Sequence, residues 1–244
     1  MLFISEKNYD KYESSRANVW LLLFTISARY GIMIKMNCGG QDMIEVKEIR
    51  KQDYKKARQF AVTGMHFEWY MSSKFMLGLY SRYFWDLELN KATKTYGAYI
   101  DGELVGVLMA EIKGEPHRFH SRKRAAFIKF IDALQNILAG KGVSTYDDAN
   151  VDMFRSLCAR ETPDGEIVFL AADPECKVKG IGTALLSALE RDEKGKLVYL
   201  YTDDGCTYQF YEHRGFVREE ERDIVMELNE KPVPLTCMIY AKRL

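Results

Sequence analysis

The stretch from Glu166 to Thr183, E-I-V-F-L-A-A-D-P-E-C-K-V-K-G-I-G-T, constrains the fold more than any other part of the chain. Its first seven residues form a compact apolar run that predicts a strand over 166–172. A helix with one apolar face is predicted over 180–191, and it opens on two glycines. An amphipathic helix that directly follows a strand buries its apolar face against the sheet, so this stretch predicts a layered α/β domain.

The remaining segments show the same two kinds of pattern. Strands are predicted over 43–49, 96–100, 104–112, 196–202, 216–228 and 235–241. Helices are predicted over 54–62 (with Asp53 as N-cap), 69–89, 121–139, 147–158 and 208–214. Asp101-Gly102 predicts a tight hairpin turn, and the last two strands are expected to be antiparallel. This order indicates a mixed α/β (α+β) sheet domain.

The chain of 244 residues divides into three parts in this interpretation. Residues 1–42 read as an N-terminal extension that ends in a linker-like stretch, and 43–244 read as the domain. Within the domain, 113–160 reads as a helical insertion whose first helix begins with basic residues. The apolar run at 19–26 is far shorter than the ~20 residues that span a bilayer, so no membrane association is expected.

The amino-acid composition argues against several classes of function. The 35 basic and 35 acidic side chains give a net charge of zero, so a general nucleic-acid binder is not expected. The five cysteines are odd in number and form no C-x-x-C pair. This pattern favours reduced thiols in a cytoplasmic protein and argues against a structural zinc site. His117 and His120 alone supply too few ligands for a metal centre, and none is expected.

The glycine turn has the chemistry of an anion site. Gly180 and Gly182 let a ligand approach the backbone closely, and the first N–H groups of a helix lack intrahelical partners. Lys177 and Lys179 add positive charge. The segment is not a P-loop, and it lacks the third glycine of a dinucleotide fingerprint, since Leu185 stands there. The remaining alternative is a tight strand–helix turn that binds nothing.

Two motifs resemble a known family. Residues 177–182, K-V-K-G-I-G, resemble the Q/R-x-x-G-x-G/A signature of the GNAT superfamily of N-acetyltransferases, with Lys177 in place of glutamine or arginine. Residues 210–216, F-Y-E-H-R-G-F, resemble the family's F-Y-x-x-x-G-F. The motifs lie within 166–217, and the element order extends the resemblance over 43–244. The resemblance implies a GNAT-like, mostly antiparallel central sheet flanked by helices.

The resemblance also implies acetyl-CoA (coenzyme A) as cofactor. The pantetheine arm would pair with the backbone of Leu170, Ala171 and Ala172. The backbone amides that would hold the pyrophosphate belong to Lys177, Val178, Lys179, Gly180, Ile181, Gly182 and Thr183. The chain departs from the family at Asp204, where many members carry asparagine.

Two catalytic candidates come from different branches of the family. Tyr211 matches the tyrosine that protonates the leaving thiolate in many relatives. Glu166 stands eleven residues before Lys177, like the general base of the histone-acetylating branch. A backbone N–H near Ala171 or Ala172 is the expected oxyanion donor.

The sequence says less about which residues would bind the acceptor amine than about those that would bind acetyl-CoA. Asp203, Asp204 and Glu68 form a possible acidic mouth for a cationic amine, although solvated loop acids are the simpler interpretation. The helix at 121–139 is expected to form a wall of the acceptor groove, a dimer surface or a larger core.

The sequence therefore predicts an acetyl-CoA-dependent N-acetyltransferase that moves an acetyl group to a primary amine of a small molecule or peptide by direct attack in a ternary complex. The main alternative is a non-catalytic acyl-CoA-binding module. A toxin-like enzyme acting on aminoacyl-tRNA ranks lower, because the basic cluster at 118–129 is local. A homodimer remains open.

Overall fold

The fold is built on a seven-stranded sheet in the order β1-β2-β3-β4-β5-β7-β6. The computed structural model describes residues 44–64, 73–138, 145–228 and 231–244. The strands are β1 (Glu45–Lys47), β2 (Lys94–Ile100), β3 (Glu103–Ile112), β4 (Gly165–Ala172), β5 (Leu197–Asp203), β6 (Val217–Leu228) and β7 (Lys231–Arg243). All neighbours are antiparallel except β4 and β5, which are parallel. This confirms the predicted mixed, mostly antiparallel sheet.

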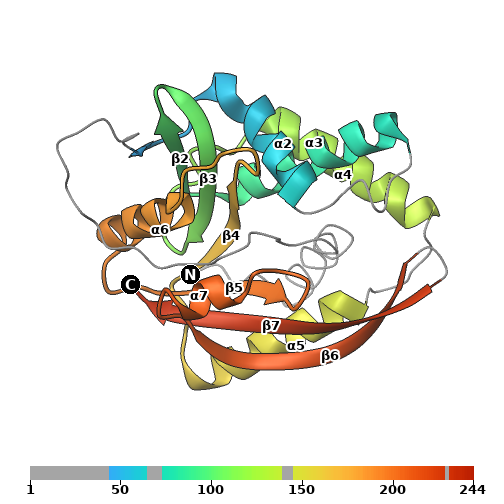
Figure 1. The fold of residues 1–244 in the computed structure, drawn as a ribbon. Helices are drawn as coiled ribbons and strands as arrows, with labels where there is room; N and C mark the ends of the chain where they lie inside the picture. The colour runs from blue at the N-terminus through green and yellow to red at the C-terminus, as the bar shows by residue number, and fades with distance from the viewer. Residues whose placement is uncertain (1–43, 65–72, 139–144, 229–230) are drawn as a thin grey trace.

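The helices are the short 3-10 turn η1 (Lys51–Asp53), α2 (Tyr54–Gly64), α3 (Lys74–Lys91), α4 (Arg122–Leu138), α5 (Thr145–Arg160), α6 (Ile181–Asp192) and α7 (Gln209–Glu212). Helix α6 packs against β2, β3 and β4, and α2 and α3 lie on the other side of the sheet (Figure 1). One apolar cluster fills each side, so the sheet is the middle of three layers.

Some local expectations are corrected. Asp53 is not an N-cap, because it lies inside the 3-10 turn η1 that leads into α2, and Arg50 is the N-cap of that turn. The Asp53 carboxylate instead accepts hydrogen bonds from Arg50 Nε at 2.6 Å and from the Tyr99 hydroxyl at 3.0 Å. The predicted helix over 69–89 is observed from Lys74 to Lys91, and its expected first residues lie outside the described residues, as do 1–43 and Glu68.

The insertion between β3 and β4 supplies α4 and α5. Helix α4 packs on α3, whereas α5 packs on β6 and β7. The basic helix thus adds Ile128 and Ile131 to the core, as one of its three expected roles requires. Helix α5 is longer than the predicted 147–158, and Phe154 brings its ring within 4.8 Å of the Tyr199 ring on β5.

The two halves of the sheet separate between β4 and β5. These strands pair only at Gly165 with Val198 and at Glu166 with Tyr199. Beyond Glu166, β4 continues to pair with β3, and β5 continues to pair with β7. Figure 1 shows β4 rising with β2 and β3 while β5 runs with β7 and β6. The result is a fork that opens towards the C-terminal ends of both strands.

Candidate active site

The open edge of β4 lies inside this fork. The N–H of Asp173 donates to the Val105 carbonyl, so its backbone faces β3. Successive residues of a strand direct their backbone groups to opposite sides. Ala171 therefore also faces β3, while Leu170 and Ala172 direct their N–H and C=O groups into the fork. Within the described residues, no strand pairs with this edge beyond Glu166. An extended ligand can add itself there as a strand does.

The glycine turn follows at the end of β4. Gly180 has φ of +90° and is the N-cap of α6, a conformation that L side chains rarely adopt. A Cβ at Gly180 would meet no atom within 4 Å, so the space beside it is open. The first intrahelical bond runs from the Ala184 N–H to the Gly180 carbonyl. The preceding amides point out of the helix start, as an anion site requires.

The side chains around this turn fit an anion in part. Lys177 and Lys179 are exposed near the helix start. Asp173 engages its carboxylate with the Glu175 N–H at 3.0 Å, and its other oxygen lies 4.0 Å from Lys56 Nζ. The Asp173 carboxylate is thus bound within its own turn, and the field of the helix start favours negative charge.

Glu166 occupies the apex of the fork. It is buried, and its carboxylate accepts a hydrogen bond from the Tyr199 hydroxyl at 3.1 Å. A β-bulge lies between Met109 and Ala110 in the pairing of β3 with β4, next to this position. Bulges redirect side chains beside functional sites. Because its partner Tyr199 also packs on Phe154 of α5, the Glu166 side chain lies on the face of the sheet that α5 covers.

Tyr211 approaches from the other side of the sheet. It belongs to the apolar cluster around α6, and its ring lies near those of Phe210, Phe216 and Tyr240. Burial raises the pKa of the phenol, with the nearby Cys206 as a smaller cause, so the phenol stays neutral at physiological pH. The structure thus places the two catalytic candidates on opposite faces of the sheet, with the fork between them.

The exposed acidic cluster expected around Asp203 and Asp204 is not what the structure shows for Asp203. Asp203 is no solvated loop acid, because it ends β5 and is 3% exposed. Its carboxylate accepts hydrogen bonds from the Tyr146 hydroxyl, the Gly205 N–H and the Cys206 thiol. Burial raises its pKa to about 6. The sequence carries one signal for this burial. Asp203 stands two residues after Tyr201, so the two side chains share one face of an apolar strand.

Asp204, the departure from the family pattern, has a structural partner. Its side chain accepts the Thr236 N–H at 3.0 Å, and its own N–H donates to the Thr236 carbonyl at 3.1 Å. These bonds attach the end of β5 to β7. Asp204 therefore links the end of β5 to β7, the two strands that form one side of the fork.

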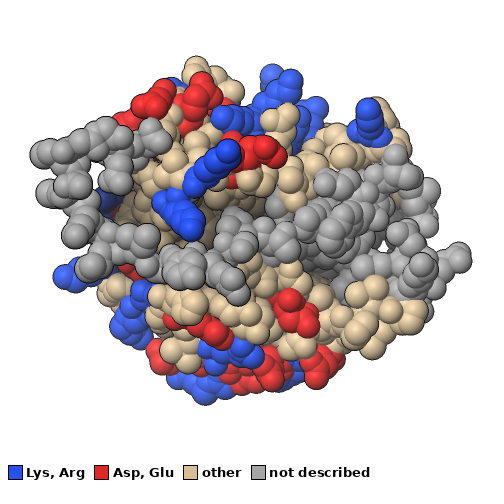
Figure 2. All heavy atoms as spheres, viewed as in Figure 1, with Lys and Arg blue, Asp and Glu red and all other residues tan. Residues whose placement is uncertain are grey.

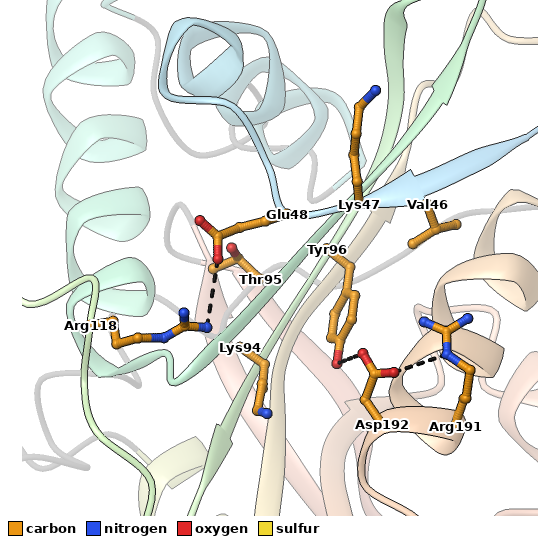
Figure 3. A pocket seen from close by; sticks show the side chains of 9 residues that line it. All are labelled: Val46, Lys47, Glu48, Lys94, Thr95, Tyr96, Arg118, Arg191 and Asp192. Carbon is orange, nitrogen blue, oxygen red and sulfur yellow. Dashed lines mark hydrogen bonds and ion pairs between the residues drawn. The ribbon is translucent and has the colours of Figure 1, made fainter.

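A separate groove of about 210 Å³ lies at the β1–β2 edge (Figure 3). It is lined by charged groups that are already paired, among them Arg118 with Glu48 at 3.6 Å and Arg191 with Asp192 at 3.0 Å. None of the candidate cofactor or catalytic residues lines it. The candidate residues therefore lie at the fork and not at this groove.

The described residues were also compared with the requirements of a metal site, a disulfide and a membrane span. Among the described residues, no group of three or more His, Cys, Asp or Glu side chains is placed to hold a metal ion. The four cysteines within the described ranges are free thiols. No helix in the described part of the chain is both long and apolar enough to cross a bilayer.

Comparison with known proteins gives a family match. The model of the acetyltransferase (GNAT) family matches residues 63–216, more than half of the chain. The match runs from α2 to the residue before β6 and contains both glycine-bearing motifs. A comparison with curated protein sequences gives no significant match.

Solved structures with a similar arrangement share little sequence. One is a histone acetyltransferase HPA2-related protein from Corynebacterium glutamicum, with 15% identity, 80% of this chain and 94% of that chain covered, and a TM-score of 0.48. Another is NAA60 from Arabidopsis thaliana in complex with a bisubstrate analogue, with 13% identity, 82% and 97% coverage and a TM-score of 0.47. A third is the PaiA N-acetyltransferase from Thermoplasma acidophilum in complex with coenzyme A, with 15% identity, 83% and 99% coverage and a TM-score of 0.44.

Proposed function

The chain belongs to the GNAT family of acetyltransferases, and on that premise we propose that it transfers the acetyl group of acetyl-CoA to a primary amine of a small molecule or peptide. The observation that carries the proposal is the fork: β4 and β5 pair only up to Glu166, and the unpaired edge of β4 leads to the glycine turn of α6. Transfer proceeds by direct attack of the amine while both substrates are bound.

The residues present fit acetyl-CoA. Ala172 offers its N–H and C=O groups, and Leu170 its C=O group, to the pantetheine amides, in the way that a neighbouring strand would. Ala171 lies between them and faces β3, so its role is to hold β4 in place. The amides from Lys177 to Thr183 bind the pyrophosphate, with the two lysines adding positive charge. When bound, acetyl-CoA supplies an acetyl group activated as a thioester.

Glu166 is the proposed general base. An alkyl ammonium has a pKa near 10.4, so the amine must lose a proton before its nitrogen attacks the carbonyl carbon. The buried carboxylate at the apex of the fork accepts that proton, directly or through water, and the Tyr199 hydroxyl orients it. The N–H of Leu170 faces the fork nearer to Glu166 than that of Ala172 does, and it is the proposed donor to the carbonyl oxygen as it gains charge.

Tyr211 is the proposed donor to the departing sulfur. As the C–S bond breaks, the electron pair stays on sulfur, and the neutral phenol donates a hydrogen bond to the thiolate. A thiol has a pKa near 8.5, below that of this buried phenol, so the phenol keeps its proton. The attacking nitrogen loses its first proton to Glu166 before attack and a second after attack, and this second proton converts the thiolate to the thiol.

Two measurements test this function. The thermal unfolding midpoint is first recorded with acetyl-CoA, ADP, NAD or no ligand; a ligand at ~100 times its Kd stabilises the folded state by about 2.7 kcal/mol. Thiol release is then followed with a panel of primary amines. A shift with acetyl-CoA and amine-dependent thiol release support the enzyme. Saturable binding without turnover on any amine would favour the acyl-CoA-binding module, and no shift would refute the cofactor assignment.

A further inference from the structure

A second pocket, separate from the fork, lies between α2, α3 and α4. It has a volume of about 340 Å³, which is within the range of small-ligand sites. Its lining residues are Tyr54, Lys55, Arg58, Arg82, Trp85, Asp86 and Arg124. None of them belongs to the proposed cofactor or catalytic set. In the space-filling view, Lys and Arg side chains gather over the part of the surface where α2 lies (Figure 2).

The charges around this pocket do not balance. Four of its lining side chains are cationic and only Asp86 is acidic. Asp86 has one close partner, Arg82, at 3.5 Å. Burial raises the pKa of this carboxyl even though three arginines lie near enough to lower it. Lys55 and Arg58 have no ion pair with any residue that the structure describes. The pocket therefore carries an excess of positive charge.

The dipole of α4 adds to that excess. Arg124 lies in the first turn of α4, and that turn has no acidic residue. At α2 the preceding 3-10 turn supplies Asp53, so only the start of α4 lacks an acid. The start of a helix carries partial positive charge and favours anions, so an external anion beside Arg124 is stabilised there.

The pocket also has an aromatic wall. The rings of Tyr54 and Trp85 lie 5.4 Å apart, and Trp85 is 3% exposed. Behind this wall, the Trp85 indole meets the Phe169 ring of β4 edge-on at 6.3 Å. Guanidinium groups bind phosphate through paired hydrogen bonds, and aromatic faces stack on planar rings. The combination suits a ligand that has both an anionic group and a ring.

We propose that this pocket binds a small phosphate ester that carries a planar base, of the nucleoside monophosphate class. Arg58 and Lys55 bind the phosphate, and the partly buried ring of Tyr54, with the buried Trp85 behind it, contacts the base. A phosphate ester carries about −1.5 to −2 charge at neutral pH, which matches the excess better than a single carboxylate. The contact between Trp85 and Phe169 places this ligand directly behind the cofactor strand.

The test is calorimetric titration of the full chain with AMP, adenosine and inorganic phosphate, without acetyl-CoA. AMP is expected to bind more tightly than either part, because only AMP uses both the cations and the aromatic wall. Arg58→Gln and Lys55→Gln are each expected to weaken AMP binding by about tenfold or more. Lys51→Gln is the matched control, since it removes the same charge from an exposed position one turn earlier, outside the pocket.

The competing outcomes are distinct. The proposal is overturned if AMP does not bind, if adenosine binds as tightly as AMP, or if Lys51→Gln weakens binding as much as Arg58→Gln. It is also overturned if saturating CoA displaces AMP while Arg58→Gln has no effect, because AMP then occupies the fork. Since the readout is binding without acetyl-CoA, the result is independent of whether the chain acetylates amines.

Discussion

Gly182 lies so close to Phe210 that a Cβ on the glycine would sit 3.0 Å from Cζ of the ring. The two residues come from different motifs, one in the first turn of α6 and the other in the aromatic segment of α7. Their contact brings the start of α6 and the Tyr211 helix together. A glycine here permits close approach between the elements rather than an unusual backbone angle.

Gly182→Ala is therefore expected to displace Phe210, lower stability by about 1–3 kcal/mol and weaken acetyl-CoA binding. Unfolding in urea and the thermal shift with acetyl-CoA measure the two effects. Gly78→Ala is the control, because a Cβ at this exposed position of α3 meets nothing within 4 Å. The control is expected to be neutral or to stabilise by about 0.5–1 kcal/mol. Equal losses in both variants would contradict the packing argument.

Glu166→Gln is expected to lower kcat by ~10²-fold or more while acetyl-CoA binding is retained. The amide oxygen of glutamine can still accept the Tyr199 hydroxyl, so the fold is expected to be stable. The rate of the variant should also lose the rise with pH that the general base gives to the wild-type enzyme. A pH–rate profile unchanged in shape would remove Glu166 from the base role.

Tyr211→Phe is expected to lower kcat without a comparable change in stability. Its hydroxyl makes no hydrogen bond to any described residue, while its ring is enclosed by Phe210, Phe216 and Tyr240. Removing the oxygen therefore leaves the packing intact and removes only the donor to the sulfur. Kinetics at saturating amine, with unfolding in urea as the control, separate the two effects. A loss of stability with normal kcat would assign the tyrosine to packing.

Asp203 is expected to make the protein less stable as the pH rises from about 4 to 6. Its folded pKa of about 6 lies above the usual 3.8, so the folded state holds the proton more tightly than the unfolded state. Stability is then greatest below pH 4 for this group and falls by roughly 3 kcal/mol as both states ionise. Asp203→Asn should remove that slope and equal or exceed the wild type in stability at pH 7. Urea unfolding between pH 4 and 7 measures it, and parallel pH curves for the two proteins would refute the assignment.

The buried Glu193, with two lysine partners, is expected to contribute more to stability than an exposed acid with one short ion pair. It is 2% exposed and lies 2.6 Å from both Lys94 and Lys196. Glu193→Gln leaves these lysines without that charge and is expected to cost about 1–3 kcal/mol. The matched control is Glu161→Gln, whose exposed pair with Arg243 at 2.9 Å is expected to contribute under about 1 kcal/mol. Urea unfolding compares them, and similar losses would show that burial does not strengthen the pair.

Much of the site followed from local sequence. The strand over 166–172, the glycine turn and the helix over 180–191 are found as β4, Gly180 and α6 with shifts of one residue at their ends. These elements are specified by short-range rules, namely alternation of apolar residues, the left-handed conformation at glycine and the spacing of helix faces. The two motifs that carry the family resemblance lie inside the matched range 63–216.

Tertiary structure decided the features that depend on contacts between distant parts of the chain. Whether β4 and β5 stay paired depends on β3 and β7, which draw the strands apart after Glu166. The same long-range packing buries Asp203 under Tyr146 of the insertion and raises its pKa. It also gathers four cations from α2, α3 and α4 around one pocket. The sequence by itself determined which segments form strands and helices, because those choices depend on neighbours along the chain. The fork, the buried acid and the basic pocket depend on neighbours in space, so only the folded chain decided them.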